Sequence, residues 1–170
     1  LTGEGLQHAD GHSPLAAAAM PHVIHFDPAC GYEIRHIVKD GLERMYGDGS
    51  DGRDPNVIYY LTVYNEPMVQ PAEPENVDVE GILRGIHRIA EHDHAGGPKV
   101  QLLASGVGVP WALHAKQLLR DDWGVDAAVW SVTSWNELRR DGIEVDQYNF
   151  LHPSEERREA FITRKLRETE

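Results

Sequence analysis

A proline-rich stretch near the middle of the chain limits what this sequence can fold into. Residues 66–76 contain three prolines. Proline lacks a backbone N–H and its ring clashes with the preceding helical turn, so this stretch can form neither a regular helix nor an interior strand. We therefore interpret it as an interdomain linker between one folded part at 1–65 and another at 77–170.

The part before the linker alternates strand and helix. Residues 22–26 (HVIHF) and 57–63 (VIYYLTV) are rich in β-branched and aromatic side chains and predict two short strands. Residues 29–46 between them predict a helix, because their apolar side chains recur at helical spacing. The residues expected on its inward face are Ile34, Ile37, Val38, Leu42 and Met45.

The part after the linker repeats this alternation. Residues 80–94 predict a helix, and residues 100–104 and 127–133 predict strands. Between these strands, a tight turn at 105–110 carries a proline suited to start a helix that reaches Trp123. The residues expected to face inward are Ile82, Leu83, Ile86 and Ile89 in the first helix and Ala112, Ala115, Leu118 and Leu119 in the second.

Two further helices are predicted from Ser134 onward. Ser134 and Glu137 match a capping box that starts a short helix. The charged stretch from Ser154 onward predicts a surface helix, and the four tryptophans are expected to fill the core.

The order of these elements predicts the fold class. A strand joined to the next strand through a helix favours parallel pairing, because the crossover returns the chain in the same direction. We therefore expect an α/β protein of two partial three-layer domains with mostly parallel sheets, joined by the proline-rich linker.

Composition argues against several functions. The chain carries 28 acidic and 16 basic residues, a formal net charge of −12. Nucleic acid and anionic membrane surfaces are therefore poor partners, because phosphate binding needs a basic face. No apolar run approaches the roughly 18 residues that span a bilayer. The single cysteine, Cys30, excludes an intramolecular disulfide and fits a reducing compartment, and we expect it to be a buried small side chain.

The most informative stretch runs from Gly3 to Ser13 and reads GEGLQHADGHS. It combines three glycines with two histidines, one glutamate, one aspartate and one glutamine. Glycine lets the backbone approach a ligand closely, and imidazole exchanges protons near neutral pH. The stretch predicts a catalytic loop, although its composition fits a solvated polar loop equally well.

A metal site is a competing interpretation of the same loop. His8, Asp10 and His12 could place two imidazoles and a carboxylate on one cation, as in a metal-dependent hydrolase. The glycines count against this hypothesis, because zinc ligands in such motifs usually lie on a regular element. A further alternative is that the isolated chain is an inactive structural module.

Several segments together carry a resemblance to a known family. TGEGLQHADGHS is followed by FDPACGYEIRHIVKDGLERMYG, YYLTVYNEPMVQPAEPE, KVQLLASG, VWSVTSWNELRRDG and NFLHP. In this order they resemble segments of the E1 component of bacterial, homodimeric pyruvate dehydrogenases, the first matching that family's GEGLQHxDGHS. The resemblance covers nearly the whole chain.

The resemblance implies a transketolase-like fold of three α/β domains. The first domain binds the diphosphate and a magnesium ion, the middle one binds the aminopyrimidine, and the third serves mainly in assembly. By this resemblance, residues 1–65 are the end of the middle, pyrimidine-binding domain. Residues 77–170 are then the first part of the C-terminal domain.

The resemblance also implies roles for the residues of the first segment. His8 and Glu4 match the family's active-site positions and are expected to be catalytic. His8 would hydrogen-bond a substrate-derived oxygen or carboxylate, and Glu4 would orient it or exchange protons with it. Asp10, His12 and Gln7 are expected to support the substrate or the loop.

The activity and partners implied by the resemblance are those of a pyruvate dehydrogenase (acetyl-transferring). Thiamine diphosphate with Mg²⁺ decarboxylates pyruvate, and the acetyl group passes to the lipoyl group of the dihydrolipoyl acetyltransferase, E2. The protein is expected to be a cytoplasmic homodimer. Gly47–Asp48–Gly49 imitates the start of the family's magnesium motif but follows a helix, so we interpret it as a surface turn. We expect both ends to be cuts, and the isolated chain to bind cofactor poorly and show no turnover.

Overall fold

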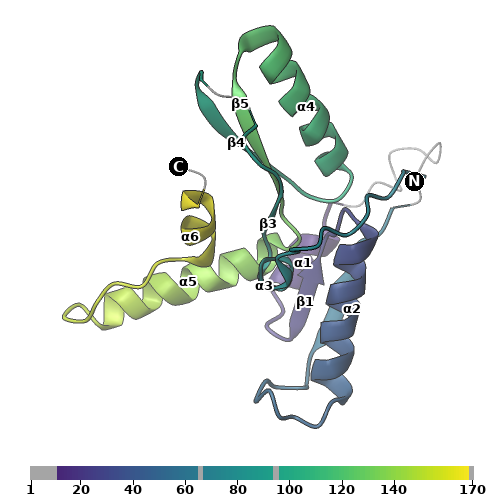
Figure 1. The fold of residues 1–170 in the computed structure, drawn as a ribbon. Coiled ribbons are helices and arrows are strands. Elements are labelled where there is room, and N and C mark those ends of the chain that lie inside the picture. Colours follow the sequence, from purple (N-terminus) through teal and green to yellow (C-terminus); the bar gives the residue numbers. More distant parts are fainter. Residues whose placement is uncertain (1–10, 65–66, 94–95, 169–170) are drawn as a thin grey trace.

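The first of two β-α-β units lies before the linker. The structure is a computed structural model that describes residues 11–64, 67–93 and 96–168 (Figure 1). The elements of this unit are α1 (Ser13–Ala18), β1 (Val23–Phe26), α2 (Gly31–Tyr46) and β2 (Ile58–Leu61). β1 and β2 pair in parallel, with Val23 opposite Ile58 and Phe26 opposite Leu61. Both predicted strands and the predicted helix are confirmed.

The second unit follows the linker and contains a three-stranded sheet. Its elements are α3 (Val79–Arg84), β3 (His87–Ala90), β4 (Lys99–Ala104), α4 (Gly108–Trp123), β5 (Asp126–Ser131), α5 (Trp135–Leu151) and α6 (Phe161–Arg167). The strand order is β3-β5-β4, with β4 and β5 parallel and β3 antiparallel to β5. Figure 1 shows α4 lying along β4 and β5. The expected α/β fold with mostly parallel sheets is confirmed.

The helix predicted over residues 80–94 is correct at its start and wrong beyond residue 84. α3 ends at Arg84, and Gly85 follows with φ at 108°, a left-handed conformation that glycine adopts without a Cβ clash. The chain then extends into β3, which pairs with β5. Ile82 and Ile86 are both fully buried, but they lie on either side of this turn. Helical spacing of apolar residues was a misleading signal here, because a turn placed both side chains in the core.

The predicted inward face of α2 is only partly correct. Ile37 is fully buried, whereas Val38 and Leu42 are 44% and 53% exposed. The buried side of the helix instead carries Glu33, Ile37 and Gly41, which are spaced four residues apart. A Cβ at Gly41 would lie 3.0 Å from the Tyr59 ring, so the glycine allows α2 to approach β2 closely.

The predicted inward face of α4 also needs correction. Leu118 is 48% exposed, and the buried positions of this helix are Val109 and Lys116. The Lys116 ammonium donates to the backbone oxygens of Glu91 and Ala127 at 2.6 and 2.7 Å. A long polar side chain therefore points inward from a position that the apolar pattern did not include, while Leu118 points outward.

The helix after β5 begins as expected but is long. Ser134 is its N-cap, and its hydroxyl accepts a hydrogen bond from the backbone N–H of Glu137 at 3.1 Å. The helix continues for 17 residues. Of the four tryptophans, Trp130 alone is buried, and the other three, Trp111, Trp123 and Trp135, are exposed. The expectation that all four fill the core is therefore wrong.

One hydrophobic cluster spans both units. Phe26 and Ile37 from the first unit share it with Ile82 and Val109 from the second. A second cluster lies within the second unit and includes Trp130 and Phe161, where α6 packs against the sheet. The residues described on either side of the linker are therefore packed against each other.

Substitution of Gly85 by alanine should destabilise the chain. A Cβ at this position would lie 2.5 Å from the backbone oxygen of Ser134, and φ is left-handed. We expect Gly85→Ala to lower the free energy of unfolding by about 3 kcal/mol, measured by thermal or urea denaturation.

Gly124→Ala is the matched control for that substitution. Gly124 also has a positive φ, of 63°, but nothing lies within 4 Å of its Cβ position. Gly124→Ala should lower the free energy of unfolding by only about 1 kcal/mol, which is the cost of a left-handed backbone conformation at alanine. Equal losses in the two variants would show that the contact with Ser134 is unimportant.

Candidate functional site

Four of the five residues predicted to form the site, including both that were predicted to be catalytic, lie outside the described residues. These are Glu4, Gln7, His8 and Asp10. His12 is described: it is exposed and precedes α1, and its backbone oxygen accepts from the N–H of Ala16 at 2.9 Å. The described end of the glycine-rich segment therefore leads directly into α1.

Side chains at the start of α5 bind the backbone of the segment that contains α1. The Asn136 amide donates to the backbone oxygen of Pro14 at 3.3 Å. The Ser134 hydroxyl donates to the backbone oxygen of His25 at 2.5 Å. Asn136 is 8% exposed and Ser134 is 1% exposed, so both bonds are made with little competition from water.

Arg140 makes the remaining contacts of this kind. Its guanidinium Nη2 donates to the backbone oxygens of Met20 at 2.8 Å and Val23 at 2.7 Å. Its Nη1 donates to the Glu137 carboxylate at 2.6 Å, which orients the guanidinium plane. We call Ser134, Asn136 and Arg140 the α5 donor cluster.

A second set of contacts gathers around Asp27, at the carboxyl end of β1. Its carboxylate accepts from the hydroxyls of Thr62 at 2.6 Å and Tyr64 at 2.7 Å, both of which follow β2. Its backbone N–H donates to the oxygen of Thr133 at 2.7 Å, and its backbone oxygen accepts from Gly106 at 3.2 Å. Burial and the bond to Asp27 raise the pKa of Tyr64 above its ordinary value, so the hydroxyl stays protonated.

The Asp27 contacts join the carboxyl ends of strands from both units. Gly106 follows β4, and Thr133 follows β5. A Cβ at Gly106 would lie 2.6 Å from the Tyr64 hydroxyl, so only glycine lets the chain approach this closely. In open α/β sheets, ligands bind beyond the carboxyl ends of the strands. This edge is therefore the candidate ligand-facing edge of the described structure.

A buried acid–base pair lies between the two units. Glu33, at the start of α2, is fully buried, and one of its oxygens lies 2.6 Å from Nε2 of His87 in β3. The other oxygen accepts from the backbone N–H groups of Ala29 and Cys30 at 2.6 and 2.9 Å. Burial acts to raise the pKa of Glu33, but the hydrogen bonds from His87 and Cys30 outweigh it, and the net pKa lies below its ordinary value.

Cys30 itself is a buried small side chain, as expected. It is 4% exposed, and burial together with the nearby Glu33 carboxylate raises the pKa of its thiol to about 11. A thiol with such a pKa is a poor nucleophile at neutral pH.

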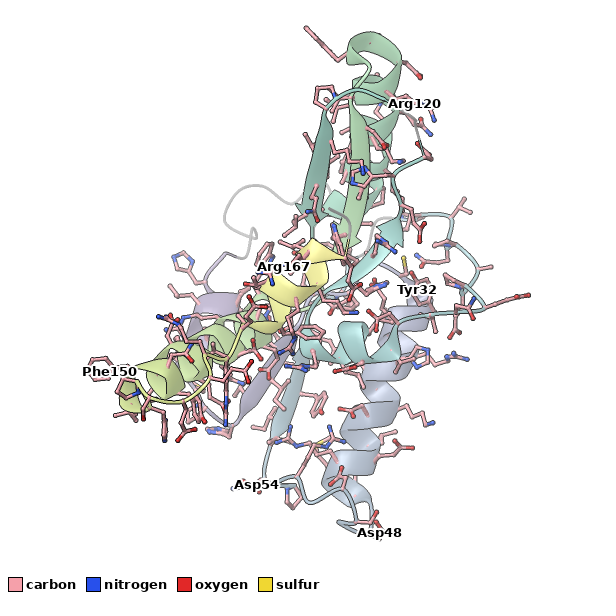
Figure 2. The ribbon with its side chains drawn as sticks, turned by 60° about the vertical axis from the view of Figure 1, so that its left-hand side comes forward. Tyr32, Asp48, Asp54, Arg120, Phe150 and Arg167 are labelled. Carbon is pink, nitrogen blue, oxygen red and sulfur yellow. The ribbon has the colours of Figure 1, made fainter. Side chains whose placement is uncertain are left out.

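The loop between α2 and β2 lies away from this junction. Figure 2 shows Asp48 and Asp54 at one end of α2 and Tyr32 at the other, where the helix meets the second unit. Gly47, Asp48 and Gly49 are all exposed, in keeping with the predicted surface turn.

Within the described residues, no group of three or more His, Cys, Asp or Glu side chains could hold a metal ion. In the same part of the chain, no helix is both long and apolar enough to cross a bilayer. The metal site proposed from His8, Asp10 and His12 includes residues outside the described ranges.

Sequence reasoning missed the contacts that build this site. The sequence alone assigns no functional role to Asp27 or to Arg140. One signal was available for Asp27: a carboxylate directly after a buried strand lies at the ligand-facing edge of a parallel sheet. No comparable signal existed for Arg140, because its acceptors are backbone oxygens more than a hundred residues earlier.

Solved structures with a similar arrangement include transketolases. A transketolase mutant from Pichia stipitis in complex with fructose 6-phosphate has a TM-score of 0.59 at 19% identity, covering 81% of this chain and 18% of that one. The complex of the same organism's enzyme with sedoheptulose 7-phosphate gives the same TM-score and coverage. The chain therefore has a transketolase-like fold.

Sequence comparison shows which family within the transketolase-like fold this chain resembles. Residues 1–71 match the pyruvate dehydrogenase E1 component middle domain, and residues 85–169 match the transketolase-like C-terminal domain. The pyruvate dehydrogenase E1 component of Mycobacterium tuberculosis is 52% identical over 98% of this chain, and that of Escherichia coli is 44% identical over 98%. The chain belongs to the pyruvate dehydrogenase E1 family. It spans 17% and 18% of the lengths of these two relatives.

The buried pair predicts a specific pH dependence of stability. The folded pKa of Glu33 lies below its ordinary value of 4.5, so its ionised form stabilises the fold above that pH. This contribution is lost as the pH falls through the folded pKa. We expect Glu33→Gln to lower the free energy of unfolding at pH 7 by about 3 kcal/mol and to flatten its decline between pH 7 and 3.

Denaturant titrations at several pH values would measure this effect. Glu43→Gln is the matched control, because Glu43 lies on the same helix with its side chain 63% exposed and only a 3.7 Å ion pair to Lys39. That variant should follow the unsubstituted chain at every pH. A decline in Glu33→Gln as steep as in the control would contradict the role of the buried carboxylate.

Proposed function

We propose that this chain is part of a pyruvate dehydrogenase E1 component that decarboxylates pyruvate and reductively acetylates the lipoyl group of E2. One observation supports this above all: both halves of the chain match this family's domains in order, over nearly the whole length. The proposed domain division places residues 1–65 at the end of the pyrimidine-binding domain and residues 77–170 in the C-terminal domain, with 66–76 as the linker.

In this proposal, the chain's own residues bind the substrate and manage protons. Thiamine diphosphate, when bound, supplies the stabilisation of negative charge on carbon that decarboxylation needs. His8 donates a hydrogen bond to the substrate-derived oxygen or carboxylate, and Glu4 orients the imidazole or exchanges a proton with it. Asp10, His12 and Gln7 support the loop or the substrate.

The cofactor and the partners belong to the same proposal. The family is thiamine-diphosphate-dependent, and we assign no residue of this chain to holding the diphosphate or Mg²⁺. An E2 dihydrolipoyl acetyltransferase is the acetyl acceptor, the working protein is a cytoplasmic homodimer, and the isolated 170 residues show no turnover. The matches to E1 components favour this function over a metal-dependent hydrolase using His8, Asp10 and His12.

Substitution of His8 provides the first test of this function. In a full-length protein carrying this chain, His8→Ala should lower pyruvate-dependent acetyl transfer to the lipoyl group by about a hundredfold or more, while folding stays nearly intact. His114→Ala is the control, because His114 is exposed on α4. Unchanged acetyl transfer in His8→Ala would contradict the assignment of His8 as a catalytic residue. Zinc binding that depends on His8 and His12 would favour the metal-dependent hydrolase.

Substitution of Glu4 tests proton management. Glutamine keeps the size of the side chain but cannot ionise, so Glu4→Gln should shift the pH dependence of kcat for pyruvate turnover. The measurement is the pH profile of steady-state rates at saturating pyruvate. An unaltered profile would mean that Glu4 has a structural role only.

A further inference from the structure

The α5 donor cluster donates hydrogen bonds to backbone carbonyl groups in the stretch that follows the glycine-rich segment. Its three side chains make four hydrogen bonds to backbone oxygens. The oxygens are those of Pro14, Met20, Val23 and His25. They lie at the start of α1, just after its end, and along β1.

These acceptors gain partners from outside their own segment, although Met20 also accepts from the backbone N–H of Val23 at 3.1 Å. α1 has only six residues and no side-chain cap at His12, so it has little stability of its own. The last carbonyls of a helix and those that follow it have no partner within the helix. Arg140 supplies donors to two carbonyls beyond the end of α1, and Glu137 fixes the orientation of its guanidinium.

The donors and the acceptors come from different units. α1 and β1 lie within the match to the E1 middle domain, whereas α5 lies within the match to the transketolase-like C-terminal domain. The position of α1 is thus set by the second unit as well as by its own. Because α1 begins at Ser13, directly after Gly11 and His12, its position also determines where the glycine-rich segment ends.

We propose that Asn136 and Arg140 are positioning residues for the segment that carries His8. This proposal rests on the proposed function, because it assumes that the segment contacts the substrate. The two side chains lie four residues apart on one face of α5 and bind Pro14 at the start of α1 and Met20 just beyond its end. A displacement of a catalytic group by about 1 Å can cost roughly a hundredfold in rate, so loss of either contact should lower turnover without abolishing folding.

Substitution of Arg140 in a full-length protein carrying this chain tests the proposal. Arg140→Ala should lower kcat for pyruvate by about tenfold to a hundredfold with little change in KM, because the binding groups remain but the reacting groups shift. Guanidinium ion added below denaturing concentration should restore part of kcat, and Arg140→Lys should be intermediate, because lysine lacks the planar fork. Arg139→Ala is the matched control, since Arg139 is the exposed neighbour.

A second variant separates positioning from helix stability. Asn136 is the second residue of α5, where a negative charge favours the helix. Asn136→Asp is isosteric and keeps a group that favours the amino end of α5, but it removes the donor to Pro14 and places a carboxylate oxygen against the Pro14 carbonyl. It should therefore lower kcat in the same direction as Arg140→Ala.

Hydrogen exchange supplies a readout that does not depend on activity. The backbone amides of residues 11–22 should exchange faster in Arg140→Ala and Asn136→Asp than in Arg139→Ala, with little change elsewhere. Equal kcat in Arg140→Ala and Arg139→Ala would overturn the proposal. So would a loss of kcat that guanidinium does not restore and that accompanies faster exchange throughout the chain.

The same measurements distinguish this proposal from the proposed function. If the unsubstituted full-length protein fails to turn over pyruvate, the proposed function is wrong. The exchange of residues 11–22 then still decides whether Asn136 and Arg140 hold this segment in place.

Discussion

The buried contact between Glu33 and His87 constrains the whole junction between the two units. A carboxylate can be fully buried only if its oxygens are hydrogen-bonded, because desolvation of an unpaired charge is costly. Here one oxygen contacts His87 from the second unit, and the other binds two N–H groups at the start of α2. The amino end of α2 is thereby fixed against β3, and Phe26 and Ile37 are brought into a core shared with Ile82.

Most of the contacts that build the candidate site at this junction are hydrogen bonds to backbone groups. Asp27 accepts side-chain hydrogen bonds, but its own N–H and oxygen bind Thr133 and Gly106, so two strand ends from one unit align with one from the other. The α5 donor cluster likewise donates hydrogen bonds to backbone oxygens. Such contacts fix the path of the chain regardless of which side chains it carries, which suits a segment whose side chains serve a reaction.

Element type was predictable wherever the local signal agreed with packing, as for β1, α2, β4 and β5. The prediction failed at Gly85, where one left-handed residue turned an apolar helical pattern into a helix and a strand. It also failed for Lys116, since its burial depends on carbonyls that only the folded chain brings near. The glycine-rich motif was recognisable because its chemistry is local. The partners of Glu33 and Asn136 were not, because they lie 54 and 122 residues away.

Lys116 also illustrates how the fold controls chemical reactivity. Its amine is held by two carbonyl oxygens, lies 3.1 Å from the Asp93 carboxylate, and is 7% exposed. All three of its N–H donors therefore have an acceptor nearby, and the amine is shielded from solvent. Acylation requires the nitrogen lone pair of an accessible amine to attack the reagent, so an acylating agent would modify Lys39, which is 70% exposed on α2, and leave Lys116 unmodified for as long as α4 stays in place.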